Sequence, residues 1–318
     1  MHGFQKHTRS RRIALLILFL AIIIPLTGCD HPEQDNNSAV ARAAVLTADP
    51  EHSFLLDILS TGKSDCLLFR ADGHTVLIDT ADTDDVTVIL SHLYRLGITR
   101  LDYLILTHFD NDHVGGAAGI VSAIPVGEIL APNYIRRSSA CLALEDAIQE
   151  KGVPLTRMAE GRTLVLGEAT LQIDTTSLFG SDILSSESDG GDDIDENNFS
   201  LVTYLTYGSF SALLLGDAQK ARLEEYAAAH PTLTADFVKL PHHGTYTKAL
   251  RRLLESTHPR CTAVCVDSPE RPDSRLTELF AGQFSDVSLY LTCQGVVHLA
   301  GNASEWVFWQ ENPSGNVS

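Results

Sequence analysis

The chain has 318 residues and a formal net charge of −18, with 44% hydrophobic and 20% charged residues. This composition is typical of a globular protein and excludes a disordered chain, while the lack of any period among 22 Gly and 12 Pro excludes the fibrous classes. So acidic a chain is also a poor candidate for binding nucleic acid over a broad basic face.

The first 28 residues form a basic and apolar leader. They contain four bases and no acid, so removing their charge from the total of −18 leaves −22 for the rest of the chain. An apolar run at 13–24 ends at Pro25. Its length fits the core of a secretory signal peptide better than a membrane span, which needs about 20 residues. We therefore predict a signal peptide over 1–28.

Residues 26–29, Leu-Thr-Gly-Cys, resemble the lipobox of bacterial lipoproteins. The resemblance implies that Cys29 carries a lipid and becomes the mature N-terminus; an uncleaved membrane anchor is the alternative. In both cases we expect the rest of the chain outside the cytoplasm, held at the cell membrane. The small and polar residues that follow predict a flexible tether over 29–50.

Short apolar runs separated by Gly-containing turns predict strands in the first half of the domain. Helices are predicted where apolar residues share one helical face and a Gly follows, as Gly97 does after 84–96. The predicted strands are 54–59, 66–70, 75–79, 101–106 and 126–130, the second predicted helix is 142–151, and 163–173 is a predicted hairpin around Gly167.

The second half repeats this plan. Its predicted strands are 201–207, 211–215, 237–240, 262–266, 287–293, 296–299 and 306–309, and its predicted helices are 219–229, 248–255 and 273–280. Two successive sets of strands and helices predict two sheets packed face to face with helices outside. We place them in one domain over 51–312, followed by a tail at 313–318. The acidic residues 181–196 predict a solvated loop within it.

Five cysteines follow Cys29, and this odd number at irregular spacing does not predict a disulfide framework. Cys261 and Cys265 lie on one predicted strand, about 13 Å apart, which is too far for a bond. We expect these cysteines to be small buried side chains.

The most informative motif is Thr-His-Phe-Asp-Asn-Asp-His-Val-Gly-Gly at 107–116, directly after a predicted strand. Imidazoles and carboxylates gathered in one strand-end loop suit Zn, Mn or Fe; a polar surface loop is the alternative. Two more motifs follow buried strands, namely Gly216-Asp217 and Pro-His-His-Gly at 241–244. Because all three motifs occupy strand ends, we expect their side chains to meet in one site.

This series of motifs resembles the metallo-β-lactamase fold, in the ComEC-like branch of competence-protein hydrolase domains. That branch carries His-x-Asp-x-Asp-His, then Gly-Asp, then Pro-His-His-Gly. The similarity includes Asp57, Gly-Lys-Ser-Asp at 62–65, Leu-Ile-Asp-Thr at 77–80 and Asn197 or Asn198, so it covers about residues 53–309. It implies an α/β fold, an αββα sandwich of two mixed sheets with the site at one edge.

The resemblance implies one or two divalent metal ions, Zn or Mn, and six ligands: His108, Asp110, Asp112, His113, His243 and Asp217. His108 and Asp110 would hold one ion, at what we name the first metal position. Asp112, His113 and His243 would hold another, at the second metal position, and both ions would share Asp217. Metal-bound hydroxide would then attack a phosphorus or carbonyl centre.

Catalytic roles are expected for Asp112, Asp110 and His242. Asp110 is either a ligand or a base, and His242 either is a ligand or orients one. Lys239 precedes the paired histidines and either neutralises substrate charge or faces solvent. His92 is expected on the polar side of its helix, and His298 has no evident partner.

The chain departs from true lactamases in two ways. It has Asp110 where they have a second histidine, and it has no histidine between His113 and Asp217. The first metal position is therefore carboxylate-rich, weak or empty, with a preference moved from Zn towards Mn or Mg. These departures argue against β-lactam hydrolysis. Arg271 stands where the family often has His and is suited to holding a phosphate.

We therefore expect a membrane-tethered, extracytoplasmic metal-dependent hydrolase of phosphodiester bonds. The substrate would be a small molecule, a short nucleic acid or an envelope phosphodiester, the last as in phosphorylcholine esterases of similar fold. The alternative is a non-catalytic binding lipoprotein with a degenerate metal site. No Gly-x-Ser-x-Gly motif supports a serine hydrolase.

Overall fold

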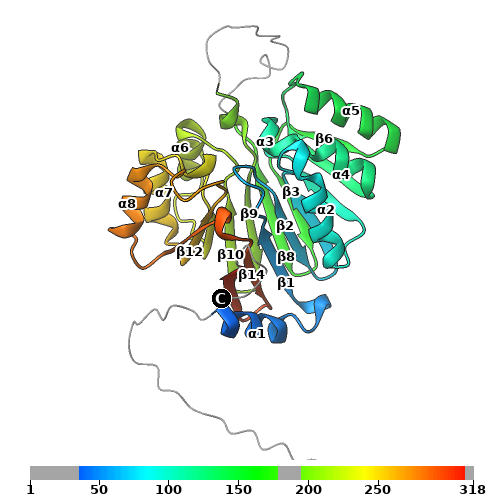
Figure 1. Ribbon diagram of the computed structural model, residues 1–318. Helices are drawn as coiled ribbons and strands as arrows, with labels where there is room; N and C mark the ends of the chain where they lie inside the picture. Colours follow the sequence, from blue (N-terminus) through cyan, green and yellow to red (C-terminus); the bar gives the residue numbers. More distant parts are fainter. Residues whose placement is uncertain (1–35, 178–194, 312–318) are drawn as a thin grey trace, which may run out of the picture. The chain divides into compact units, whose positions relative to one another are not determined.

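The computed structural model describes residues 36–177 and 195–311, which belong to one compact unit (Figure 1). The predicted signal peptide, Cys29, most of the acidic segment 181–196 and the tail at 313–318 lie outside the described residues. Within the described ranges, every helix is too short or too polar to cross a membrane.

One half of the unit is an eight-stranded mixed sheet in the order β15-β14-β1-β2-β3-β4-β5-β6. Its strands from β3 to β6 run parallel, and the remaining neighbours are antiparallel. The strands are β1 (Phe54–Ile58), β2 (Leu67–Ala71), β3 (His74–Ile78), β4 (Leu101–Ile105), β5 (Val126–Pro132), β6 (Leu155–Met158), β14 (Val297–Gly301) and β15 (Trp306–Gln310).

The other half is a seven-stranded mixed sheet in the order β13-β12-β11-β10-β9-β8-β7. Here β10 to β13 run parallel, and β7 to β10 are antiparallel neighbours. The strands are β7 (Arg162–Leu166), β8 (Ala169–Asp174), β9 (Val202–Tyr207), β10 (Phe210–Leu214), β11 (Phe237–Lys239), β12 (Cys261–Val264) and β13 (Ser288–Leu291).

The two sheets pack face to face through a shared hydrophobic core. Phe54 and Phe69 of the first sheet share one buried cluster with Leu205 and Phe210 of the second, and the rings of Phe54 and Phe210 stack at 4.5 Å. Side chains alternate between the two faces of a strand, and helices cover the outer faces, so β1 is buried at every position. This double coverage explains why the strands read as continuous apolar runs.

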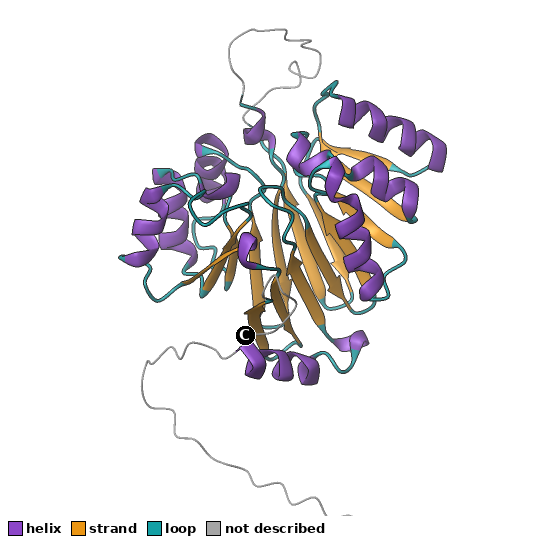
Figure 2. Ribbon diagram, in the orientation of Figure 1, coloured by secondary structure: helices purple, strands orange, loops and turns teal. Residues whose placement is uncertain are grey.

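Helices cover the outer face of each sheet (Figure 2). A second buried cluster joins the first sheet to α2 (Val86–Arg95), α4 (Ala117–Ala123) and α5 (Ser139–Lys151). A third joins the second sheet to α6 (Lys220–Ala229), α7 (Lys248–Thr257) and α8 (Ser274–Ala281). The predicted αββα sandwich is confirmed.

The predicted flexible tether over 29–50 is wrong for part of its length. Helix α1 (Asn36–Leu46) contacts β14 and β15, with Ala39 and Ala43 buried against them. Two alanines four residues apart lie on one helical face and allow close approach, but they produce only a weak apolar pattern. A second short element that the sequence does not reveal is β6, whose first three residues are only half-buried.

A buried charged network surrounds Asp57 on β1. This carboxylate accepts hydrogen bonds from His298 Nδ1 at 2.6 Å and from His92 Nε2 at 2.7 Å. Because Arg95 donates to His92 Nδ1 at 2.8 Å, Nε2 is the nitrogen of His92 that donates to Asp57. Burial alone would lower the pKa of His298, but Asp57 outweighs it and raises that pKa to about 9. His92 is thus buried rather than on a polar side of its helix, and His298, for which the sequence shows no partner, has one.

The raised pKa of His298 predicts a pH-dependent stability. A group whose pKa is about 9 when folded and about 6.5 when unfolded contributes fully below pH 6.5, and the contribution is lost as pH rises through 9. We expect His298→Gln to lower the free energy of unfolding by about 3 kcal/mol at pH 6 and by much less at pH 10. Urea unfolding at both pH values measures this, with the exposed His52→Gln as control. A deficit of equal size at both pH values would contradict the charged state of His298.

Candidate metal centre

Three strand ends bring the predicted motifs together. The loop 107–110 follows β4 and leads into the short helix α3 (Asn111–Val114), while Asp217 follows β10 and the paired histidines follow β11. The turn from α3 into α4 needs glycine at Gly115 and Gly116. A Cβ atom would lie 2.5 Å from the carbonyl of Asn111 at the first and 2.3 Å from that of Thr80 at the second. Such contacts are too close for any side chain, so this glycine pair fixes the path of the loop.

Hydrogen bonds set the proton position on His113 and His108. Asp79 accepts from His113 Nδ1 at 2.7 Å and from the Thr107 hydroxyl at 2.7 Å. Since that hydroxyl already donates its one hydrogen to the bond with Asp79, the 3.1 Å contact between Thr107 Oγ1 and His108 Nδ1 requires His108 to donate. Both imidazoles therefore carry a proton on Nδ1, and Nε2 is the nitrogen that each can offer to a cation.

His243 has the same arrangement with a different partner. Its Nδ1 donates to the backbone carbonyl of Cys265 at 3.1 Å, which leaves Nε2 free to bind a cation. A histidine that binds a metal through one nitrogen usually donates the other to a carboxylate or carbonyl, and the partners of His113 and His243 fit that pattern. The three histidines are thus oriented alike, although two different motifs supply them.

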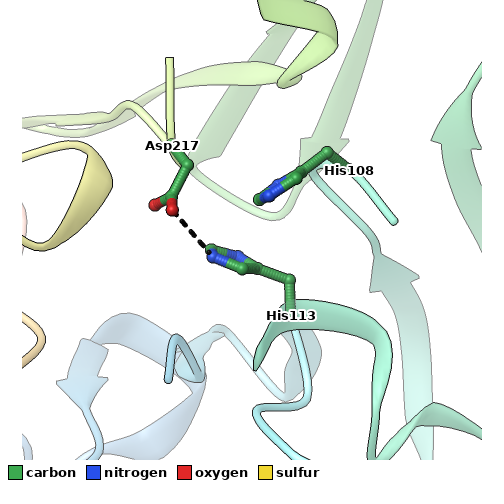
Figure 3. A group of neighbouring side chains, drawn as sticks. All are labelled: His108, His113 and Asp217. Atoms are coloured by element: carbon green, nitrogen blue, oxygen red, sulfur yellow. Dashed lines mark ion pairs between the residues drawn. The ribbon is translucent and has the colours of Figure 1, made fainter. Parts of the chain in front are cut away.

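The three Nε2 atoms of His108, His113 and His243 are buried and have no hydrogen-bond partner among the described residues. Figure 3 shows the rings of His108 and His113 directed toward Asp217. Asp217 Oδ2 lies 3.3 Å from His113 Nε2 and 3.1 Å from His243 Nε2, and Asp112 Oδ2 lies 3.2 Å from His243 Nε2. Ligands about 2.0–2.1 Å from a tetrahedral ion are about 3.3 Å from one another, so this spacing fits a metal better than hydrogen bonds.

Groups of ligand atoms that lie within 4.8 Å of one another include five of the six predicted ligands. One group is His108, His113 and Asp217, and another is Asp112, His113 and His243. Asp110 belongs to none of the groups found among the described residues. Asp65, which the sequence analysis does not assign to the site, belongs to two of them.

Asp110 is instead bound by arginine. Arg136 donates through one guanidinium nitrogen to Asp110 Oδ1 at 2.5 Å and to Glu196 Oε2 at 2.5 Å. The other oxygen of Asp110 lies 3.6 Å from His108 Nε2. The contact with His108 lowers the pKa of Asp110, and Arg136 acts in the same direction. Asp110 is therefore an ionised carboxylate at neutral pH.

His242 contributes through its backbone. Its N–H donates to Asp217 Oδ1 at 3.0 Å, and its side chain is in none of the ligand groups. His242 and His243 both have left-handed backbone conformations, with φ of 47° and 52°. Such conformations cost energy in residues other than glycine and often occur at functional sites. Here they turn the N–H of one residue and the ring of the next toward Asp217.

Lys239 is a buried cation beneath the site. It is 1% exposed, forms an ion pair with the equally buried Asp65, and lies 3.8 Å from Asp217 Oδ1. Burial alone would lower the pKa of Lys239, but Asp65 outweighs it and raises that pKa. Of the two expectations for this residue, solvent exposure is wrong. Arg271 pairs with Asp267 at the surface, 3.0 Å away.

The carboxylates around His243 attract protons as well as metal ions. Burial lowers the pKa of this histidine, but the adjacent carboxylates of Asp112 and Asp217 outweigh burial and raise the pKa to about 9. A cation that binds Nε2 must therefore displace a proton at neutral pH. The arrangement is chemically suited to holding a divalent cation between imidazoles and carboxylates.

Comparison with known proteins places all three motifs in one family. A family model described as "Metallo-beta-lactamase superfamily" matches residues 59–266. Among solved structures, YhfI of Bacillus subtilis, a metallo-beta-lactamase fold protein, is similar with a TM-score of 0.51 and 10% identity. That similarity covers 81% of this chain and 100% of YhfI.

Curated relatives with similar sequences are much longer proteins. ComE operon protein 3 of Bacillus subtilis is 25% identical over 234 residues, which are 68% of this chain and 29% of that protein. Recombination protein 2 of Haemophilus influenzae and Competence protein ComA of Neisseria gonorrhoeae are each 26% identical. These matches cover 64% and 67% of this chain, and 23% and 27% of the relatives. The chain thus spans less than a third of each relative.

Proposed function

Since this chain belongs to the metallo-β-lactamase superfamily, we propose that it is a metal-dependent hydrolase that cleaves phosphodiester bonds. The observation that carries the proposal is the set of three buried imidazole Nε2 atoms, beside Asp112 and Asp217, that have no hydrogen-bond partner among the described residues. A divalent ion such as Zn or Mn held there would supply Lewis acidity and a water acidic enough to attack at neutral pH.

The surrounding residues prepare the site before substrate binds. Asp79 and the carbonyl of Cys265 hold His113 and His243 in the tautomers that direct Nε2 inward. The N–H of His242 donates to Oδ1 of Asp217, and Oδ2 of the same carboxylate faces the histidines. These contacts are fixed in the fold, so little reorganisation accompanies the reaction.

Two cations at the rim of the site support a phosphodiester substrate. The side chains of Lys63, 3.1 Å from Asp112, and Arg136 are 43% and 35% exposed. They can therefore meet an anionic group that approaches the centre. The names of the relatives, competence and recombination proteins, and the resemblance to the ComEC-like branch point to the same substrate class. Asp110 in place of a second histidine argues against β-lactams.

We further propose that a lipid on Cys29 tethers the enzyme to the outer side of the cell membrane. The apolar run at 13–24 and the Leu-Thr-Gly-Cys motif support this placement. The substrate would then be an extracytoplasmic nucleotide, a short nucleic acid or an envelope phosphodiester. In fractionated cells the activity should be found with the membranes, and mass spectrometry of the mature N-terminus should find a lipid on Cys29. A lipid-free Cys29 in the wild type would contradict the tether.

The reaction class is tested with bis(p-nitrophenyl) phosphate and a chromogenic β-lactam, assayed side by side on the purified full chain in detergent. We expect phosphodiester turnover that EDTA abolishes and Mn or Zn restores, and no β-lactam hydrolysis. Turnover that is unaffected by EDTA would contradict metal dependence. A protein that binds metal but hydrolyses neither compound would favour the non-catalytic binding lipoprotein instead.

A further inference from the structure

The contact between Arg136 and Asp110 lies at the first metal position. Asp110 Oδ2 is 3.6 Å from His108 Nε2, whereas Oδ1 accepts the hydrogen bond from Arg136 at 2.5 Å. Two charged partners at this distance form a strong, charge-assisted bond. The same nitrogen of Arg136 also donates to Glu196 at 2.5 Å, so the guanidinium is held between two carboxylates.

The backbone that carries Arg136 is itself anchored. The hydroxyl of Tyr134 accepts the N–H of Phe109 at 2.9 Å, so the segment is tied to the residue between His108 and Asp110. The Tyr134 ring lies 4.8 Å from the Phe109 ring and 4.6 Å from that of Phe199, and the Tyr134 carbonyl accepts from Arg157 at 2.6 Å. Arg136 therefore contacts Asp110 from a fixed position rather than from a freely moving loop.

Counting ligand atoms distinguishes the two metal positions. The second position has Asp112, His113, His243 and one oxygen of Asp217. His113 also lies near His108, but it is counted at the second position. Without Asp110, the described residues then leave the first position with His108 and the shared Asp217. Catalytic metal sites ordinarily use at least three protein ligands, so the first position is one ligand short as long as Arg136 keeps Asp110.

We propose that Arg136 withholds Asp110 from the first metal position, so that the chain binds a single divalent ion at the second position and Arg136 supplies the positive charge that a second ion would bring. This inference rests on the proposed function only in requiring that a metal binds. It assigns to Arg136 a positioning role, exerted through Asp110, that sets metal stoichiometry.

Manganese titration of the metal-free full chain in detergent tests the proposal. Bound Mn is counted after gel filtration, and its electron paramagnetic resonance spectrum separates isolated ions from coupled pairs. The wild type should bind one isolated ion, and Arg136→Gln should bind two coupled ions because Asp110 is released. The double variant Arg136→Gln/Asp110→Asn should return to one ion. Arg137→Gln, which removes the neighbouring exposed charge, should behave as the wild type.

Every other result would contradict the inference. Two ions in the wild type would overturn the inference and leave the proposed hydrolase intact, whereas no bound ion would overturn both. A single ion in Arg136→Gln would show that Arg136 is not what keeps the first position unfilled. Two ions in the double variant would exclude Asp110 as the added ligand and overturn the inference as well.

Discussion

Replacing His243 with alanine should abolish metal binding at the second position and lower kcat/KM for a phosphodiester by more than about 100-fold. Changes to residues that merely support a ligand cost about 10–100-fold in affinity or activity, so loss of a ligand should cost more. Its Nε2 lies within 3.2 Å of both Asp112 and Asp217, and no other described imidazole is placed to take over both contacts.

Metal content after gel filtration and steady-state kinetics measure the two effects together. His52→Ala, which removes an exposed histidine, is the matched control and should retain metal and turnover. His242→Ala keeps the backbone N–H that donates to Asp217 and should cost less than His243→Ala. Wild-type metal content and turnover in His243→Ala would refute the assigned centre.

Lys239→Met should lower the free energy of unfolding of the metal-free protein by about 3–5 kcal/mol. Removing one partner of a buried ion pair leaves the other as an uncompensated charge, and Asp65 is 0% exposed. Replacing both partners with apolar residues removes that penalty. The double variant Asp65→Leu/Lys239→Met should therefore recover most of the loss.

Urea unfolding at pH 7 with EDTA measures this prediction. The matched control is Arg42→Met, because Arg42 pairs with Glu305 at the surface with side chains 56% and 54% exposed. An exposed pair contributes about 0–1 kcal/mol. If Lys239→Met lost no more than Arg42→Met, the buried pair would not support the fold in the way its burial indicates.

Most of the site residues that the sequence predicts correctly lie at the ends of strands. The loop at 107–113, Asp217 and His243 each follow a buried strand, and parallel neighbours such as β10 and β11 end at one edge. Local spacing and strand pattern therefore suffice to predict that these groups meet. The sandwich follows from the same apolar runs, since both faces of each sheet are covered.

Contacts between distant segments are what the sequence does not reveal. The partner of Asp110 is 26 residues away, in a loop whose path depends on the packing of Tyr134. Lys239 and Asp65 are 174 residues apart, and a lysine in a strand of three residues has no pattern that distinguishes burial from exposure. Asp57 and His298 pair across 241 residues for the same reason. Pairing specificity here is decided by tertiary packing and not by neighbouring residues.

The most direct test of the metal centre is X-ray absorption at the Zn edge of the zinc-reconstituted full chain. We predict nitrogen and oxygen neighbours at about 2.0–2.1 Å, with the outer-shell scattering of two imidazoles, from His113 and His243. In His243→Ala any zinc that remains bound should show less imidazole scattering. An all-oxygen shell without imidazole scattering in the wild type would contradict the centre described here.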